Sequence, residues 1–194
     1  MRSFSGCGSY LSMHCRQEDK PMKRSTLIHL RIPFSYYLSP IFFFAVSLSS
    51  RPDWWRVSLM FVILHLFLFP ATNGFNSYYD RDTGSIGGIE HPPPVSDELL
   101  WASLAFDAFA VVLGLCIDWR VALAVFVFGL GSKAYSYSRI RIKRLPVVSW
   151  IGVVLFQGAF VFLISYYAIN DVTVGDLARG GILIPALLSS AFLM

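Results

Sequence analysis

The chain has 194 residues, of which 55% are hydrophobic and 14% are charged, and its formal net charge is +4. Long uncharged runs and a mean hydropathy of +0.57 are typical of an integral membrane protein and exclude an ordinary soluble domain. Because the charges cluster between apolar runs, we interpret the basic excess as a topology signal, and we expect no nucleic-acid partner. Cys7, Cys15 and Cys116 have no metal-ligand or disulfide spacing.

Six apolar runs follow a polar, basic N-terminal segment. We expect residues 1–29, which are rich in Ser, to form a disordered cytoplasmic tail. The predicted membrane spans cover residues 32–49, 57–75, 99–117, 121–135, 147–169 and 180–194. Pro33 and Pro40 are expected to kink the first span, and the last run is shorter than the about 20 residues that crossing requires. The predicted fold class is an all-α, polytopic transmembrane helix bundle with about six spans.

The basic residues are divided unevenly between the two sides of such a bundle. With the tail inside, twelve Lys and Arg lie on the cytoplasmic side: six in or next to the tail, and Arg81, Lys133, Arg139, Arg141, Lys143 and Arg144. Four lie outside, at Arg51, Arg56, Arg120 and Arg179. Twelve against four follows the positive-inside rule. We therefore predict a cytoplasmic N-terminus and cytoplasmic polar segments after the second and fourth runs, in the plasma membrane if the protein is bacterial.

The polar segment after the second run, residues 73–88, contains a candidate metal site. If the helix continues into this segment, Asn73, either Asn76 or Ser77, and Asp80 fall at i, i+3 or i+4, and i+7, on one helical face. Oxygen ligands on one face at a membrane boundary suit a Mg²⁺ ion that also holds a diphosphate. Asp82 lies about 200° around the helix from Asp80, so it joins these ligands only if the helix ends before it.

An ordinary connection between spans explains the same segment without a ligand, because Gly, Asn and Asp are common in turns and at helix ends. Two polar residues inside the predicted spans leave a similar choice open. His65 fits a hydrogen bond to a neighbouring helix better than a metal site. Asp107 is either a functional intramembrane carboxylate or a hydrogen-bonded packing residue.

A second polar segment follows the fourth run, and basic and apolar side chains alternate within it. In an extended conformation, Arg139, Arg141 and Lys143 share one edge. Three cations on one edge can neutralise a diphosphate, with Arg binding it through two hydrogen bonds and Lys acting as a point charge. Tyr135 and Ser136 add hydroxyl donors. Basic residues at this place are also what positive-inside sorting and anionic lipids produce.

The first polar segment resembles a signature of the UbiA superfamily of intramembrane prenyltransferases. The signature reads Asn-Asp-x-x-Asp-x-x-x-Asp after the second helix, and Asn76 and Asp80 match it in register. Ser77 and Gly84 replace two of its aspartates. The Tyr-Tyr-Asp sequence and the glycine are similar to the branch that prenylates a naphthoate in menaquinone synthesis.

The second polar segment resembles another signature of this superfamily, Tyr-Ser-x-Pro-Pro-x-Arg-x-Lys after the fourth helix. Its matching residues are Tyr135, Ser136, Arg141 and Lys143. Ser138 and Arg139 replace the two prolines. Both signatures occur in the expected order and after the expected spans, and the resemblance covers residues 31–194.

The resemblance implies a bundle of nine spans, so residues 30–194 are expected to be the N-terminal part of a transmembrane prenyltransferase domain. It implies Mg²⁺ as cofactor and transfer from an isoprenyl diphosphate to an aromatic or lipid-soluble acceptor, as in quinone or isoprenoid biosynthesis. Asp80 and Asn76 are then the catalytic residues. The family's second Asp-rich motif, expected after the sixth span, has no counterpart in this sequence, which predicts a truncated chain with incomplete activity.

In this mechanism, the aromatic faces of Phe75, Tyr78 and Tyr79 are candidates to stabilise the allylic cation. Two other functions stay open. A CDP-alcohol phosphotransferase requires an Asp-Gly…Ala-Arg…Gly…Asp…Asp pattern, which this sequence lacks. A catalytically inactive or truncated membrane protein with a packing or assembly role is the alternative that the missing Asp-rich motif favours.

Overall fold

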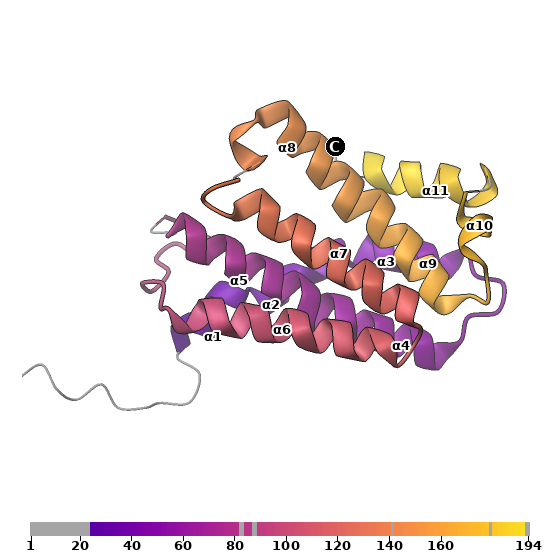
Figure 1. Ribbon diagram of the computed structural model, residues 1–194, viewed down its shortest axis with the longest axis horizontal. Helices are drawn as coiled ribbons and strands as arrows, with labels where there is room; N and C mark the ends of the chain where they lie inside the picture. The colour runs from indigo at the N-terminus through magenta and orange to yellow at the C-terminus, as the bar shows by residue number, and fades with distance from the viewer. Residues whose placement is uncertain (1–23, 82–83, 87–88, 141, 179, 193–194) are drawn as a thin grey trace, which may run out of the picture.

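Helices account for nearly all of the regular structure in the computed structural model, which describes residues 24–81, 84–86, 89–140, 142–178 and 180–192. The helices pack side by side as a bundle, and the described residues form no strand (Figure 1). The predicted all-α helix bundle is therefore confirmed.

In chain order, the helical elements have the following bounds. They are α1 (Arg24–Leu30), α2 (Ile32–Ser35), the 3₁₀ turn η1 (Tyr36–Leu38), α3 (Ser39–Ser47), α4 (Trp54–Val62), the π-helical turn η2 (Ile63–Leu68), α5 (Phe69–Asp80), α6 (Glu98–Leu115), α7 (Trp119–Ser136), the 3₁₀ turn η3 (Ile142–Arg144), α8 (Pro146–Val153), the π-helical turn η4 (Val154–Phe160), α9 (Val161–Ile169), α10 (Val174–Leu177) and α11 (Gly180–Ala191).

Three helices in the described part of the chain are long and apolar enough to cross a membrane. Their bounds are Trp54–Asp80, Glu98–Leu115 and Pro146–Ile169. They correspond to the second, third and fifth predicted spans. The fourth predicted span forms α7, which carries Arg120 and Lys133 near its ends, and the sixth forms the 12-residue α11.

The helix from Trp54 to Asp80 is continuous and has 27 residues, so it is about 40 Å long. At its start, the Asp53 carboxylate accepts hydrogen bonds from the backbone N–H groups of Trp55 (3.0 Å) and Arg56 (3.4 Å). This is a regular N-terminal cap. At its end, Arg81 adopts the left-handed conformation, with φ 52°. The helix therefore extends beyond the predicted span and includes the polar residues that precede Arg81.

The first predicted span is a series of short helices and not one kinked helix. Arg31 has φ 48° and separates α1 from α2. Pro33 lies in the first turn of α2, and Pro40 lies in the first turn of α3. A proline in the first turn does not remove a helical hydrogen bond, so each proline begins a helix where we predicted a kink.

The predicted tail overlaps the first helix. Residues 1–23 lie outside the described residues, and α1 begins at Arg24. Within α1, Thr26, His29 and Leu30 are buried. The His29 ring nitrogen Nε2 lies 2.8 Å from the Pro93 carbonyl oxygen in the proline-rich connection before α6.

The core is rich in aromatic side chains, including the fully buried Phe42 and Phe162. His65, in η2, is also fully buried, and its ring stacks on Phe61 with centroids 4.3 Å apart. Its Nδ1 lies 3.1 Å from the Phe61 carbonyl oxygen. These contacts favour a packing role for His65, but its hydrogen bond is to its own helix, whereas we had predicted one to a neighbouring helix.

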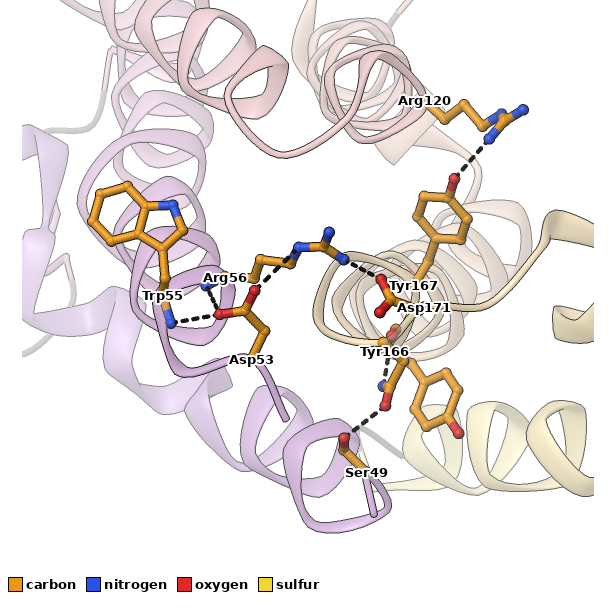
Figure 2. A network of polar contacts seen from close by, with 9 residues as sticks. Ser49, Asp53, Trp55, Arg56, Arg120, Tyr166, Tyr167 and Asp171 are labelled. Carbon is orange, nitrogen blue, oxygen red and sulfur yellow. Dashed lines mark hydrogen bonds and ion pairs between the residues drawn. The ribbon is translucent and has the colours of Figure 1, made fainter. Parts of the chain in front are cut away.

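Polar contacts join the helices at the end of the bundle where the long helix begins (Figure 2). Arg56 donates to Asp171 at 2.9 Å, and Arg120 donates to the Tyr167 hydroxyl at 3.1 Å. Ser49 donates to the Asn170 side chain at 2.6 Å. Two of the four arginines predicted to lie outside, Arg56 and Arg120, therefore share one end of the bundle. The polar segment at the other end of the long helix lies about 40 Å away.

Candidate active site

The polar residues of α5 lie beside the second polar segment, although many residues separate them in the chain. The last turns of α5 and α7 and the start of α8 lie at the same end of the bundle (Figure 1, left). Because α5 remains helical through Asp80, Asn73, Asn76 and Asp80 share a face, as their spacing predicts.

A set of hydrogen bonds connects the two segments. The Asn76 Oδ1 atom accepts from the Ser136 hydroxyl at 2.7 Å and from the Lys143 ammonium at 3.0 Å. The same Lys143 ammonium forms an ion pair with the Asp80 carboxylate. The side chains of Lys143 and Asp80 are only 16% and 21% exposed. Hydrogen bonds to charged groups are worth about 1.5–3 kcal/mol, so this pair is a substantial link between α5 and the segment after α7.

The position of Lys143 tests whether these residues suit a metal ion. One cation, the ammonium, lies within bonding reach of both Asn76 Oδ1 and Asp80 Oδ1. Two neutral or anionic oxygens converging on one positive charge are a suitable partial ligand set for Mg²⁺. No group of three or more His, Cys, Asp and Glu is close enough to hold a metal within the described residues. Further ligands must therefore come from a substrate, from water or from elsewhere in the chain.

A cavity of about 300 Å³ opens next to this contact and lies between α5, α7 and the α8–η4 helix. Four of the predicted site residues line it: Asn73, Asn76, Tyr135 and Ser136. The Tyr135 hydroxyl also accepts a hydrogen bond from Ser149 at 3.1 Å. The volume is at the lower end of the range for small-molecule sites.

The structure describes only one of the three remaining predicted site residues. Arg139 is exposed, and it is not part of the cavity wall. Arg141 and Asp82 lie outside the described residues. The helix ends at Asp80, before Asp82, which is the condition we set for Asp82 to join the other ligands.

The cavity also contains residues that we did not predict. Thr72, Ser132 and Gln157 contribute polar groups, and Phe128 and Phe156 contribute aromatic rings. Gln157 is a polar residue in an otherwise apolar run, and this interruption is the sequence feature that could have indicated a role in the cavity. Phe75, Tyr78 and Tyr79, our candidates for cation stabilisation, are not among the lining residues.

Asp107 in α6 forms an ion pair with Lys133 in α7. From the sequence we had counted Lys133 only among the basic residues that indicate topology. The two side chains are 14% and 19% exposed. The Lys133 ammonium lies 5.2 Å from the centroid of the Phe75 ring. Neither charged residue lines the cavity described above. The ion pair fits the packing interpretation of Asp107, but both charged side chains also line a second cavity, between α6 and α7, so a functional role stays an alternative.

Comparison with known protein families identifies the family to which the chain belongs. The sequence profile of the UbiA prenyltransferase family matches residues 37–194, so this chain belongs to that family. Neither a curated protein nor a solved structure matches the chain. Family membership and the three long apolar helices together make the protein an integral membrane protein of the prenyltransferase class.

Proposed function

We propose that this chain transfers an isoprenyl group from an isoprenyl diphosphate to an aromatic or other lipid-soluble acceptor, with Mg²⁺ as cofactor. The observation that carries the proposal is the position of the Lys143 ammonium, which bridges Asn76 Oδ1 and Asp80 Oδ1. Both signatures of the family thus contribute to a single cation-binding position beside a cavity. Its site residues would be Asn76 and Asp80, with Asn73 and Asp82 as further candidate metal ligands.

In this proposal, the donor's diphosphate binds at the cytoplasmic end of α5. Asn76 and Asp80 would hold the Mg²⁺, and the ion would supply positive charge to the diphosphate oxygens. Lys143 and Arg141 add positive charge, and the hydroxyls of Ser136 and Tyr135 donate hydrogen bonds. Arg139, being exposed, would attract the diphosphate over a distance without touching it.

The transfer step would proceed by loss of the diphosphate. The bond between the isoprenyl C1 and the diphosphate oxygen breaks, and its electron pair leaves with the diphosphate. The acceptor then gives an electron pair to C1, and its displaced proton passes to a diphosphate oxygen. Phe128 and Phe156 line the cavity, and their rings would stabilise the allylic cation, while the apolar wall would exclude water.

We further propose that this end of the bundle faces the cytoplasm. The twelve basic residues assigned to that side support this orientation. Maleimide labelling of cysteines introduced at Ser138 and at Asp171, in a chain lacking its native cysteines, tests it. We expect Ser138→Cys to react from the cytoplasmic side alone and Asp171→Cys from the opposite side. The reverse pattern would overturn the orientation.

The function is tested with the purified chain in lipid nanodiscs, labelled farnesyl diphosphate, and naphthalene-1,4-diol as the acceptor probe. We expect prenylated product with Mg²⁺ and none with EDTA. Asp80→Ala should abolish the product, while Asp97→Ala, a change at an exposed carboxylate near the same end, should not. Absence of product from the unmodified chain, or product from Asp80→Ala at the unmodified rate, would reject the proposal.

A further inference from the structure

We propose that a second cavity, on the lipid-facing side of α6 and α7, binds an uncharged membrane lipid with a hydroxyl group, namely a long-chain alcohol, and that Asp107 accepts the hydrogen bond of this hydroxyl. The cavity has a volume of about 520 Å³. The described residues that line it all belong to α6 and α7, and none of them lines the cavity beside Asn76. Binding there would be separate from the proposed prenyl transfer.

The second cavity opens towards the bilayer. Val112, Phe126 and Leu130 line it, and their side chains are exposed on the surface of the bundle. The helix that carries Val112, Glu98–Leu115, is long and apolar enough to cross a membrane, so the side chains exposed along it meet lipid. From Leu104 to Val112, the α6 wall of the cavity is about 12 Å long. An apolar wall of this length suits an alkyl chain that lies along the two helices.

The Asp107 carboxylate has acceptor capacity that the protein leaves unused. Its Oδ2 atom accepts from the Lys133 ammonium, whereas Oδ1 is buried and has no hydrogen-bond partner within the described residues, which include all of α6 and α7. Asp107 lies about 12 to 14 Å from both ends of its helix, where the bilayer offers no water as a donor. The side chain is 14% exposed and lines the cavity, so a donor in the cavity can reach the carboxylate.

The Lys133 ammonium is occupied within the protein, and this decides which headgroup fits. Besides Asp107, it lies 3.4 Å from the Gly129 carbonyl oxygen and 5.2 Å from the centroid of the Phe75 ring. Because the Asp107 carboxylate already matches its charge, a lipid phosphate or carboxylate would place an unpaired charge near the middle of the membrane, which is costly. A single hydroxyl loses much less solvation and gains a hydrogen bond to a charged acceptor. A neutral alcohol therefore fits better than a phospholipid or a fatty acid.

A hydroxyl side chain on a second protein helix is another source of the same donor. An α-helix with its side chains is about 10–12 Å wide, so one turn of it occupies about 400–600 Å³. The whole cavity has about the volume of one such turn, which is too small to seat a helix that crosses the membrane. A single alkyl chain is much narrower than a helix, so the volume favours a lipid.

The test uses two probes of equal chain length, 1-hexadecanol and its methyl ether, 1-methoxyhexadecane, which lacks the donor. Each competes with a hexadecanol that bears a photoreactive diazirine in its alkyl chain for the full chain in lipid nanodiscs, and mass spectrometry identifies the labelled peptides. We expect label on α6 and α7. 1-Hexadecanol should displace it at about a tenfold lower mole fraction than the ether, because one hydrogen bond of about 1.4 kcal/mol corresponds to a factor of ten. Equal displacement by the two probes, or no saturable label on these helices, would overturn the inference.

Two variants examine the site itself. The double variant Asp107→Leu with Lys133→Met removes the acceptor and leaves no unpaired charge. It should bind the alcohol about tenfold more weakly and lose the preference for the alcohol over the ether. Ala108→Phe keeps both charged residues and fills the cavity from an exposed lining position, so it should prevent labelling. Label retained in Ala108→Phe, or an unchanged preference in the double variant, would reject the site.

Native mass spectrometry of the same samples distinguishes a lipid from a second copy of the chain. Label on α6 and α7 together with bound alcohol supports the lipid. A dimer in which these two helices take no label would show that a second copy covers the cavity, and it would overturn the inference.

Discussion

The contact of Lys143 with Asn76 and Asp80 is the most informative feature at the scale of single residues. It joins residues 67 positions apart in the chain, and both α5 ligands meet the same ammonium. In the proposed reaction, this ammonium would bind the diphosphate, and the Asn76 and Asp80 oxygens would be left to hold the metal.

Lys143 and Arg139 form a matched pair of cations from one segment, of which one is half-buried at the site and the other is exposed. We expect Lys143→Gln to weaken the binding of Mg²⁺–pyrophosphate by about 10- to 100-fold, since a hydrogen bond to a charged group is lost. Arg139→Gln should weaken it less than about threefold, because exposed charges are screened. Calorimetric titration measures both. Equal losses would show that net charge, and not position, governs binding.

The residues of the two motifs could be predicted from the sequence, whereas Gln157 could not. Asn76, Asp80, Ser136 and Lys143 belong to short patterns in which residue type and spacing carry the chemistry. Gln157 belongs to no such pattern. Its position in the cavity depends on η4 and on the helix packed behind it, and neither follows from local spacing.

At the scale of elements, the two π-helical turns η2 and η4 were not predicted from the sequence. Long apolar runs predicted the helices that contain them, but a periodicity of 3.6 residues gives no indication of a wider turn. The first apolar run, which contains two prolines, also differs from its prediction. Its hydropathy predicted a span, and its prolines divided it into short helices.

Two glycines in the helix that contains η4 provide a matched test of its packing. A Cβ at Gly158 would lie 2.4 Å from the Ser190 Cα atom, whereas a Cβ at Gly152 would meet nothing within 4 Å. We expect Gly158→Ala to destabilise the protein by about 1–3 kcal/mol through overpacking. Gly152→Ala should stabilise it by up to about 1 kcal/mol through helix propensity. Thermal unfolding followed by tryptophan fluorescence compares them, and equal shifts would contradict the close approach of η4 and α11.

The ion pair between α6 and α7 also acts at the scale of elements. The second carboxylate oxygen of Asp107, Oδ1, is buried and has no hydrogen-bond partner within the described residues. Gly129 in α7 allows the Asp107 carboxylate to approach the helix closely, because a Cβ atom at residue 129 would lie 3.3 Å from Oδ1. The pair is therefore sensitive to the loss of either charge.

We predict that Asp107→Leu alone destabilises the protein by about 3–5 kcal/mol, because it leaves the Lys133 ammonium buried without its partner. The double variant Asp107→Leu with Lys133→Met should recover most of that loss, since no uncompensated charge remains. Unfolding in increasing SDS measures the free energies of unfolding. A double variant as unstable as the sum of its single variants would contradict this electrostatic pairing.

At the scale of the whole molecule, the bundle has two polar ends with different contents. One end holds the ion pairs and hydrogen bonds of Arg56 and Arg120 (Figure 2). The other end, about 40 Å away along the long helix, holds the cavity and the two motifs. The alternation of apolar runs and connections was sufficient to predict this division, because helices that cross in turn bring every second connection to the same end. The shape of the cavity was not predictable, since it depends on packing between α5, α7 and η4.

The central claim is that α5 and the segment after α7 bind one diphosphate jointly. Calorimetric titration of Mg²⁺–pyrophosphate into the unmodified chain, Asp80→Asn, Lys143→Gln and the double variant tests it most directly. We predict that each single variant binds at least about tenfold more weakly. The double variant should lose less than the product of the two factors, with a coupling of about 1 kcal/mol or more. Wild-type affinity in either single variant, or losses that simply multiply, would contradict a shared ligand.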